Sequence, residues 1–94
     1  MKVFKWDEEK NKKLLKERNI SFEQILVCLE NNKLIDIIQN PSHKHKNQHC
    51  LVIDYNSYCY LVPFTEEKQE YFLKTIIPSR KQTKKYLKER KKNI

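Results

Sequence analysis

The stretch HCLVIDYNSYCYLVPF, residues 49–64, decides the fold of this chain. β-Branched and aromatic residues dominate both of its halves, which predicts two strands, His49–Asp54 and Tyr58–Phe64. The segment Tyr55-Asn56-Ser57 lies between them, so the two strands are predicted to form a hairpin. Both faces of each strand are apolar, as expected of strands in the middle of a sheet.

Two helices are predicted before the hairpin. Asp7 is a good N-cap for a helix over Glu8–Arg18, because its side chain can accept a hydrogen bond from the first turn. Ser21 followed by Gln24 makes a capping box for a second helix. Apolar residues at helical spacing continue this helix until Asn31-Asn32 ends it.

Further strands are predicted on either side of these elements. Val3–Trp6 is expected to be an edge strand, and Leu34–Ile38 a short strand after the second helix. Beyond the hairpin, Thr65–Glu70 is expected to be a charged turn and Tyr71–Ile77 a further strand. Pro78 is expected to end that strand, because proline has no backbone donor for the ladder.

A closing helix is predicted from Arg80 to about Arg90, because Ser79 with Gln82 makes a second capping box. One face of this helix is almost entirely lysine, and the inner face is formed by Thr83, Tyr86, Leu87 and Arg90. Together the elements predict one α+β domain over residues 1–94. It has two N-terminal helices, an antiparallel sheet of about four strands and a basic C-terminal helix.

Turns in this chain must form without glycine, because the sequence contains none. Asparagine tolerates the left-handed conformation better than most other residues. Left-handed turns are therefore expected at the asparagines that fall between predicted elements, Asn19, Asn31, Asn32, Asn47 and Asn56.

The net charge of +8 lies mostly in the C-terminal segment. Residues 1–79 carry twelve basic and eleven acidic side chains, whereas residues 80–94 carry eight basic and one acidic. Such a patch attracts phosphate polymers, acidic proteins or anionic membranes. A membrane-surface role is disfavoured because Tyr86 and Leu87 give the closing helix only a narrow apolar face.

Composition also indicates the compartment. No stretch approaches the roughly twenty apolar residues that span a bilayer, and the charged N-terminus is unlike a signal peptide. We therefore expect a cytoplasmic protein that does not enter membranes. Cys28, Cys50 and Cys59 are odd in number and lack C-x-x-C spacing, so they are expected to be core thiols.

The first candidate site is the junction between the last strand and the closing helix. Lys74 is expected to project from the strand on the face of Phe72 and Ile76, and Arg80 to lie in the first helical turn. Free N–H groups at a helix start can bind phosphate together with a guanidinium. The alternative is that these basic residues are simply solvated.

The second candidate is the loop that holds all three histidines, His43, His45 and His49, together with Lys44 and Lys46. Histidine can both take and give a proton near neutral pH, and RNA cleavage by its own 2′-hydroxyl needs a base, an acid and cations. The spacing H-x-H-x-x-x-H could instead bind a metal ion, although no cysteine or carboxylate supports it. A solvated basic loop is the third interpretation.

Other side chains leave two interpretations open. Arg18 shares a helix face with Leu14 and Leu15, and it either caps that helix or joins a site. Five tyrosines could stack on nucleobases, although aromatic residues in strands usually belong to the core. They are Tyr55, Tyr58, Tyr60, Tyr71 and Tyr86.

Three segments together resemble a known family. Residues 4–11, FKWDEEKN, are similar to the F-x-W-D-x-x-K-x signature of BrnT-type ribonuclease toxins from bacterial toxin–antitoxin pairs. Residues 20–23, ISFE, resemble the segment G-[IV]-S-F-E that follows in the family, and residues 77–81, IPSRK, resemble its late segment I-S-A-R. The three segments occur in the family's order and nearly span the chain.

The resemblance implies a RelE-like fold, cleavage of RNA, and silencing by a small cognate antitoxin that is acidic or binds DNA. By position, Arg80 matches the arginine of the late segment, Arg18 stands where the family usually has histidine, and Asn19 where it has glycine. Arginine stays charged and does not carry protons. Proton transfer would then fall to one of the three histidines, or catalysis would rest mainly on electrostatics.

The resulting hypothesis is a ribonuclease toxin that acts without a metal or other cofactor. Its expected catalytic residues are Arg18, His45, Lys74 and Arg80, and its expected RNA-binding residues are Lys44, Lys46, Lys81, Lys84, Lys85 and Lys88. An acidic part of the antitoxin is expected to lie across residues 80–94. The alternative hypothesis is a noncatalytic RNA- or protein-binding module on the same scaffold.

Overall fold

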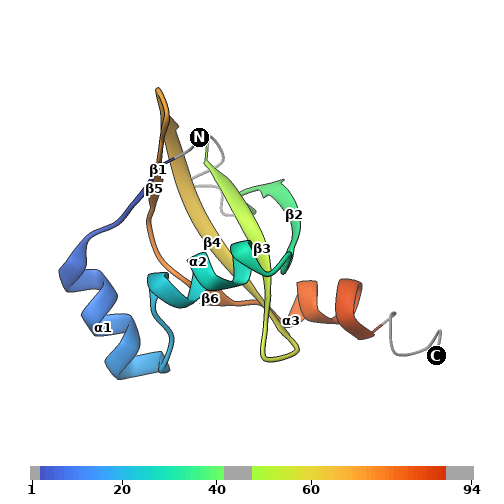
Figure 1. Cartoon of the computed structure of the whole chain (residues 1–94). Helices are drawn as coiled ribbons and strands as arrows, with labels where there is room; N and C mark the ends of the chain where they lie inside the picture. Colours follow the sequence, from blue (N-terminus) through green and yellow to red (C-terminus); the bar gives the residue numbers. More distant parts are fainter. Residues whose placement is uncertain (1–2, 42–47, 89–94) are drawn as a thin grey trace.

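The computed structural model describes residues 3–41 and 48–88. Figure 1 shows a twisted sheet with α1 and α2 toward one side and α3 at the opposite end of the molecule from the β4–β5 turn. The elements in chain order are β1 (Val3–Lys5), α1 (Glu8–Arg18), α2 (Phe22–Glu30), β2 (Leu34–Gln39), β3 (His49–Tyr55), β4 (Tyr58–Glu67), β5 (Glu70–Leu73), β6 (Ile77–Pro78), α3 (Arg80–Gln82) and a π-helix (Thr83–Lys88). The prediction of an α+β fold is confirmed.

Both N-terminal helices begin at the predicted caps. The Asp7 carboxylate accepts a hydrogen bond from the Glu9 N–H at 2.9 Å, and Ser21 with Gln24 forms the complete capping box. α1 ends at Asn19, whose φ of 56° is left-handed and whose N–H donates to the Leu15 carbonyl. These local hydrogen bonds explain why the helix bounds could be predicted from the sequence.

The sheet is mixed and has more strands than expected. Within the described residues it has six strands in the order β1-β5-β4-β3-β2, and β6 pairs with β4. β1 runs parallel to β5, so the prediction of about four strands, all antiparallel, is wrong in these two respects. The parallel pair joins segments about 67 residues apart, as in Val3 opposite Glu70, so no local pattern of the sequence predicts it.

The β3–β4 hairpin forms the centre of the sheet, as predicted. Asn56 and Ser57 both have positive φ, 52° and 63°, which suits a tight turn between twisted strands. β4 continues to Glu67 and turns at Lys68, whose φ is 57°. The expected turn over Thr65–Glu70 is therefore wrong, because its first half is strand.

The predicted strand Tyr71–Ile77 is interrupted by a bulge. Phe64 of β4 lies opposite Leu73, but Leu61 lies opposite Ile77, so the β5–β6 segment has one extra residue over this stretch. Pro63 explains the break, because it lacks the N–H that would continue the ladder, while its carbonyl accepts from the Lys74 N–H at 2.8 Å. Pro78 is the last residue of β6, so the strand ends at this proline and not just before it.

Each face of the sheet has its own apolar cluster. On the face of α1 and α2, Leu14, Ile20, Phe22 and Ile25 pack against alternate residues of β3 and β4, and Ile76 is fully buried among them. On the other face, Cys50, Val52, Cys59 and Leu61 are covered by Leu87 of the π-helix, with Tyr86 partly buried beside them. All three cysteines are buried and none forms a disulfide, which confirms them as core thiols.

The asparagine turns follow the expectation in part. Asn19, Asn32 and Asn56 have positive φ, as expected for a chain without glycine. Asn31 has a negative φ, −99°. It is the C-cap of α2, and the left-handed residue is the following Asn32. Asn47 lies outside the described residues.

Asn11 links the two N-terminal helices and generates a stability prediction. Its buried side chain accepts from the Phe22 N–H at 2.7 Å and donates to the Glu23 carboxylate at 2.6 Å, a bond that lowers the pKa of Glu23. Asn11→Ala leaves the N–H of fully buried Phe22 without its acceptor and should lower the free energy of unfolding by about 2 kcal/mol.

Denaturant unfolding of Asn11→Ala and of Glu23→Ala compares the losses in the free energy of unfolding. Glu23 is exposed, so its removal should cost much less than the loss of Asn11. Equal losses for the two variants would show that the bond to Phe22 contributes nothing of its own.

Candidate functional site

The junction between β6 and α3 is held on β4 by hydrogen bonds on both sides of Cys59. The Ser79 N–H donates to the Cys59 carbonyl at 2.9 Å, and the Cys59 N–H donates to Thr83 Oγ1 at 2.8 Å. Thr83 Oγ1 in turn donates to the Ser79 carbonyl at 2.7 Å. The backbone on either side of Arg80 is therefore attached to the central hairpin.

Only half of the second capping box forms. Ser79 Oγ accepts from the Gln82 N–H at 3.2 Å, but the Ser79 N–H is used by Cys59, so Gln82 cannot complete the box. Within residues 3–41 and 48–88, the buried Gln82 Oε1 is left without a partner. The helix is α-helical only over Arg80–Gln82 before the π-helix begins, so a phosphate site here depends on side-chain charge more than on a helix dipole.

Arg18 reaches this junction from the other end of the chain. It is the last residue of α1, and its guanidinium donates to the carbonyl of Ile76, 58 residues away. Ile76 belongs to the bulge that separates β5 from β6, and Arg80 follows four residues later. The structure thus brings Arg18 to the segment that carries Arg80, and both side chains are largely exposed.

Lys74 lies only partly as predicted. It follows the end of β5, and its ammonium lies 4.6 Å from the centre of the Phe72 ring. Ile76 is fully buried while Phe72 is 38% exposed, so Lys74 lies beside Phe72 as expected but Ile76 does not share their exposed face. The expected strand geometry is wrong here because the bulge at Lys74–Ile76 shifts the alternation of side chains.

His49, which lies in the described part of the chain, is not at the junction. His43 and His45, with Lys44 and Lys46, lie outside the described residues. His49 begins β3 and pairs with Phe64, whereas the junction pairs with β4 at Tyr60. Four residues of strand separate these positions, or about 13 Å.

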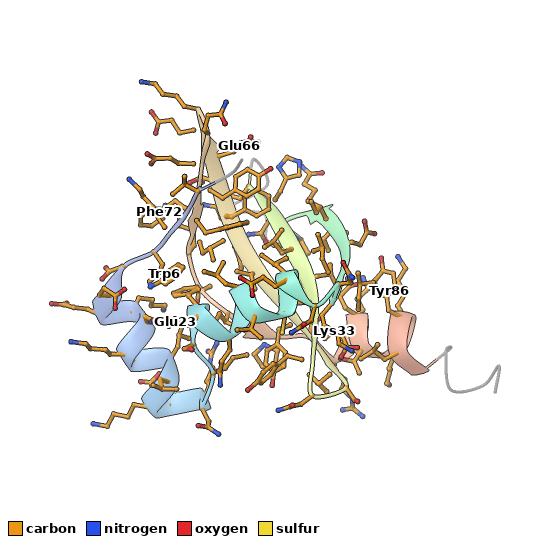
Figure 2. The ribbon with its side chains drawn as sticks, viewed as in Figure 1. Trp6, Glu23, Lys33, Glu66, Phe72 and Tyr86 are labelled. Carbon is orange, nitrogen blue, oxygen red and sulfur yellow. The ribbon has the colours of Figure 1, made fainter. Side chains whose placement is uncertain are left out.

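His49 instead lines a groove of about 500 Å³ at the far end of the sheet, together with Ile37, Phe64, Thr65, Glu66 and Tyr71. Figure 2 shows Glu66 and Phe72 at this end, away from Tyr86. The carboxylate of Glu66 disfavours a phosphate in the groove. The groove is therefore a poor candidate for the site of phosphate chemistry.

The described part of the closing helix has the expected two faces. Lys81, Lys84 and Lys85 are exposed, and the Lys85 ammonium lies 5.1 Å from the centre of the Tyr86 ring. The Tyr86 hydroxyl donates to Asp36 of β2 at 2.9 Å. Lys88 is the last residue of the π-helix, and Arg90 lies outside the described residues.

Two residues that position the junction were not singled out from the sequence. Pro63 produces the bulge, and Thr83 connects Cys59 to Ser79. A proline inside a run of strand-forming residues was a usable signal, because proline in a sheet is found at edges or bulges. The role of Thr83 had no local signal, since its partner lies on a distant strand.

The described residues limit the chemistry available. No group of three histidine, cysteine or acidic side chains among them could hold a metal ion. None of the described helices is both long and apolar enough to cross a membrane. Exposed guanidinium and ammonium groups on a rigid junction can bind and stabilise negatively charged phosphate.

Fold and site together define a small α+β protein with a cationic surface suited to a phosphate polymer. The model of one family, described as the ribonuclease toxin BrnT of type II toxin–antitoxin systems, matches residues 6–85. The chain belongs to this family, as its three resembling segments indicated. The family is one of ribonucleases that act on RNA and are paired with an antitoxin. No curated protein and no solved structure gave a match.

The contact of Arg18 with the Ile76 carbonyl generates a prediction. Arg18→Ala should lower the free energy of unfolding by about 1 kcal/mol, because the bond is only partly buried. It should reduce RNA cleavage more than this stability loss explains, since the segment before Arg80 loses its support.

Cleavage assays and melting curves on Arg18→Ala and Arg18→Lys separate the two effects. Lysine can still donate one hydrogen bond to the carbonyl, so its activity should lie between those of the other two proteins. Full activity of Arg18→Ala would remove Arg18 from the site.

Proposed function

We propose that the chain cleaves RNA at the β6–α3 junction, with Arg80 as the main group that contacts the scissile phosphate. The observation that carries this proposal is the contact of Arg18 with the Ile76 carbonyl. Through this contact, Arg18 of α1 binds the segment that carries Arg80. The late arginine of the family resemblance is the same Arg80. Lys81, Lys84 and Lys85 extend the positive surface along the closing helix.

The proposed reaction uses the substrate's own 2′-hydroxyl. The 2′-oxygen bonds to phosphorus while the bond to the 5′-oxygen breaks, which leaves a 2′,3′-cyclic phosphate and a 5′-hydroxyl. A base takes the 2′-hydroxyl proton, and an acid protonates the leaving oxygen. Negative charge accumulates on the phosphoryl oxygens in the transition state, where Arg80 and Arg18 would stabilise it.

The proton carriers are the less constrained part of the proposal. His49 is held at the other end of β4, in the groove with Glu66. His45, which precedes β3 in the sequence and lies outside the described residues, is the proposed carrier, with Lys74 as an additional cation near the bulge. The reaction needs no metal ion, because arginine supplies the positive charge that a metal would otherwise provide.

Arg80 gives the central prediction. Loss of one preorganised donor to a transition state costs about two to three orders of magnitude in rate, so Arg80→Ala should abolish toxicity and cleavage. Its melting temperature should stay near that of the parent protein, because exposed charges contribute little to stability. Arg80→Lys should recover only part of the rate, since an ammonium cannot make a two-pronged contact.

The measurements are growth after induction, melting curves and cleavage of RNA, with and without a chelator. Lys12→Ala, at an exposed position of α1, is the matched control and should behave as the parent. Undiminished cleavage by Arg80→Ala would place the active site elsewhere, and loss of cleavage in chelator that zinc or magnesium restores would contradict the metal-free mechanism.

The antitoxin is proposed to be acidic and to cover the start of the closing helix, where it hides Arg80. Reversing Lys84, Lys85 and Lys88 together to glutamate should weaken the complex, and the affinity of the parent complex should fall as salt increases. Titration of the purified pair at low and high salt measures both effects. An affinity unchanged by the three reversals would place the interface on another surface.

A further inference from the structure

Three tyrosines form an aromatic cluster at the end of the β3–β4 hairpin. The ring centres of Tyr55 and Tyr60 are 5.8 Å apart and those of Tyr58 and Tyr60 are 5.7 Å apart, each pair in an edge-to-face arrangement. Cross-strand pairing places Tyr55 opposite Tyr58 and Tyr60 opposite Ile53, on the face that also carries α1 and α2. The rings therefore form one continuous surface.

The tyrosine cluster is only partly explained by packing. Phe22 and Ile53 on the same face are fully buried, whereas each of the three tyrosines keeps part of its surface in solvent. A tyrosine hydroxyl is neutral at physiological pH and does not repel phosphate, and burial with the neighbouring Tyr55 and Tyr58 raises the pKa of Tyr60 further. A partly exposed, uncharged aromatic surface is suited to stacking with a flat ring.

The tyrosine cluster is attached to the segment that carries Arg80. Cys59 lies between Tyr58 and Tyr60, and its backbone bonds to Ser79 and Thr83. Tyr60 also lies directly opposite Pro78 in the β4–β6 pair. Figure 1 shows the hairpin turn at the same end of the molecule as α3.

We propose that the tyrosine cluster binds a nucleobase of single-stranded RNA beside the phosphate held at Arg80, an inference that rests on the proposed cleavage at the junction. Stacking on Tyr58 and its neighbours fixes the nucleotide, and the arginines take its phosphate. Bases in a duplex do not expose their faces, so the substrate is single-stranded RNA or an unpaired loop. Every base has such a face, so this contact tolerates many sequences.

The test compares two fluorescent oligonucleotides that cannot be cleaved, a 2′-O-methyl RNA and the same backbone with abasic positions. The parent protein should bind the oligonucleotide with bases more tightly. Tyr58→Leu should lose about tenfold in affinity for it, within the range for stacking of a base on an aromatic residue, and nothing for the abasic one. Tyr58→Phe should keep the parent affinity, because stacking needs the ring and not the hydroxyl.

Two further variants control for folding and for general effects. Tyr55→Leu repeats the test at the neighbouring ring if Tyr58→Leu does not fold. Tyr86→Leu removes a tyrosine from the opposite face and should leave the preference for bases unchanged.

Four outcomes overturn the tyrosine cluster as a base site. They are equal affinity of the parent for both oligonucleotides, an undiminished preference for bases in both leucine variants, equal weakening of both oligonucleotides, and, when the variants are also titrated with the antitoxin, weakening of only that complex. Failure of the proposed function is a different result. There, the parent protein does not cleave RNA, although it still prefers the oligonucleotide with bases.

Discussion

Pro63 imposes the constraint on which the geometry of the candidate site depends. Proline has no backbone N–H, and in an antiparallel pair a residue presents its N–H and C=O to the same neighbour. That neighbour is the segment from β5 to β6, because the Pro63 carbonyl accepts from the Lys74 N–H. The missing donor is accommodated by a bulge, and in the bulge the Ile76 carbonyl accepts from Arg18. The bulge opposite a single proline in a central strand thus provides the carbonyl through which α1 contacts the segment before Arg80.

Two parts of the fold, α1 and β4, then hold one short segment. Arg18 binds it at Ile76, β4 pairs with it at Ile77 and Pro78, and the Cys59 backbone binds it at Ser79. The positive side chains can therefore stay exposed, where desolvation costs little, while the backbone from which they project is held in place. A backbone held in this way suits the proposed stabilisation of a transition state, because the segment that carries Arg80 need not move when negative charge develops.

Features decided by neighbouring residues could be predicted from the sequence, and features that join distant segments could not. Asp7 and Ser21 marked the helix starts because a cap binds N–H groups only two or three residues away. The pairing of Val3 with Glu70 and the contact of Arg18 with Ile76 depend on the complete fold. Both Arg18 and Arg80 are candidates from the sequence, but only the structure shows that Arg18 contacts the segment that carries Arg80. The predicted position of Lys74 is wrong because Pro63, on the paired strand, causes a bulge in the segment that carries Lys74.

The two ends of β4 differ in the charge of the residues around them. Glu66 and Glu67 end the strand, with Glu70 paired opposite Glu67, whereas the junction with Arg80 is attached near its beginning. The strand has ten residues, and at about 3.3 Å per residue its ends are about 30 Å apart. Since exposed charges are screened over about 8 Å at physiological salt, the acidic end hardly weakens the attraction at the junction. It repels phosphate only locally, which favours an approach of RNA from the end that carries Arg18, Arg80 and the tyrosine cluster.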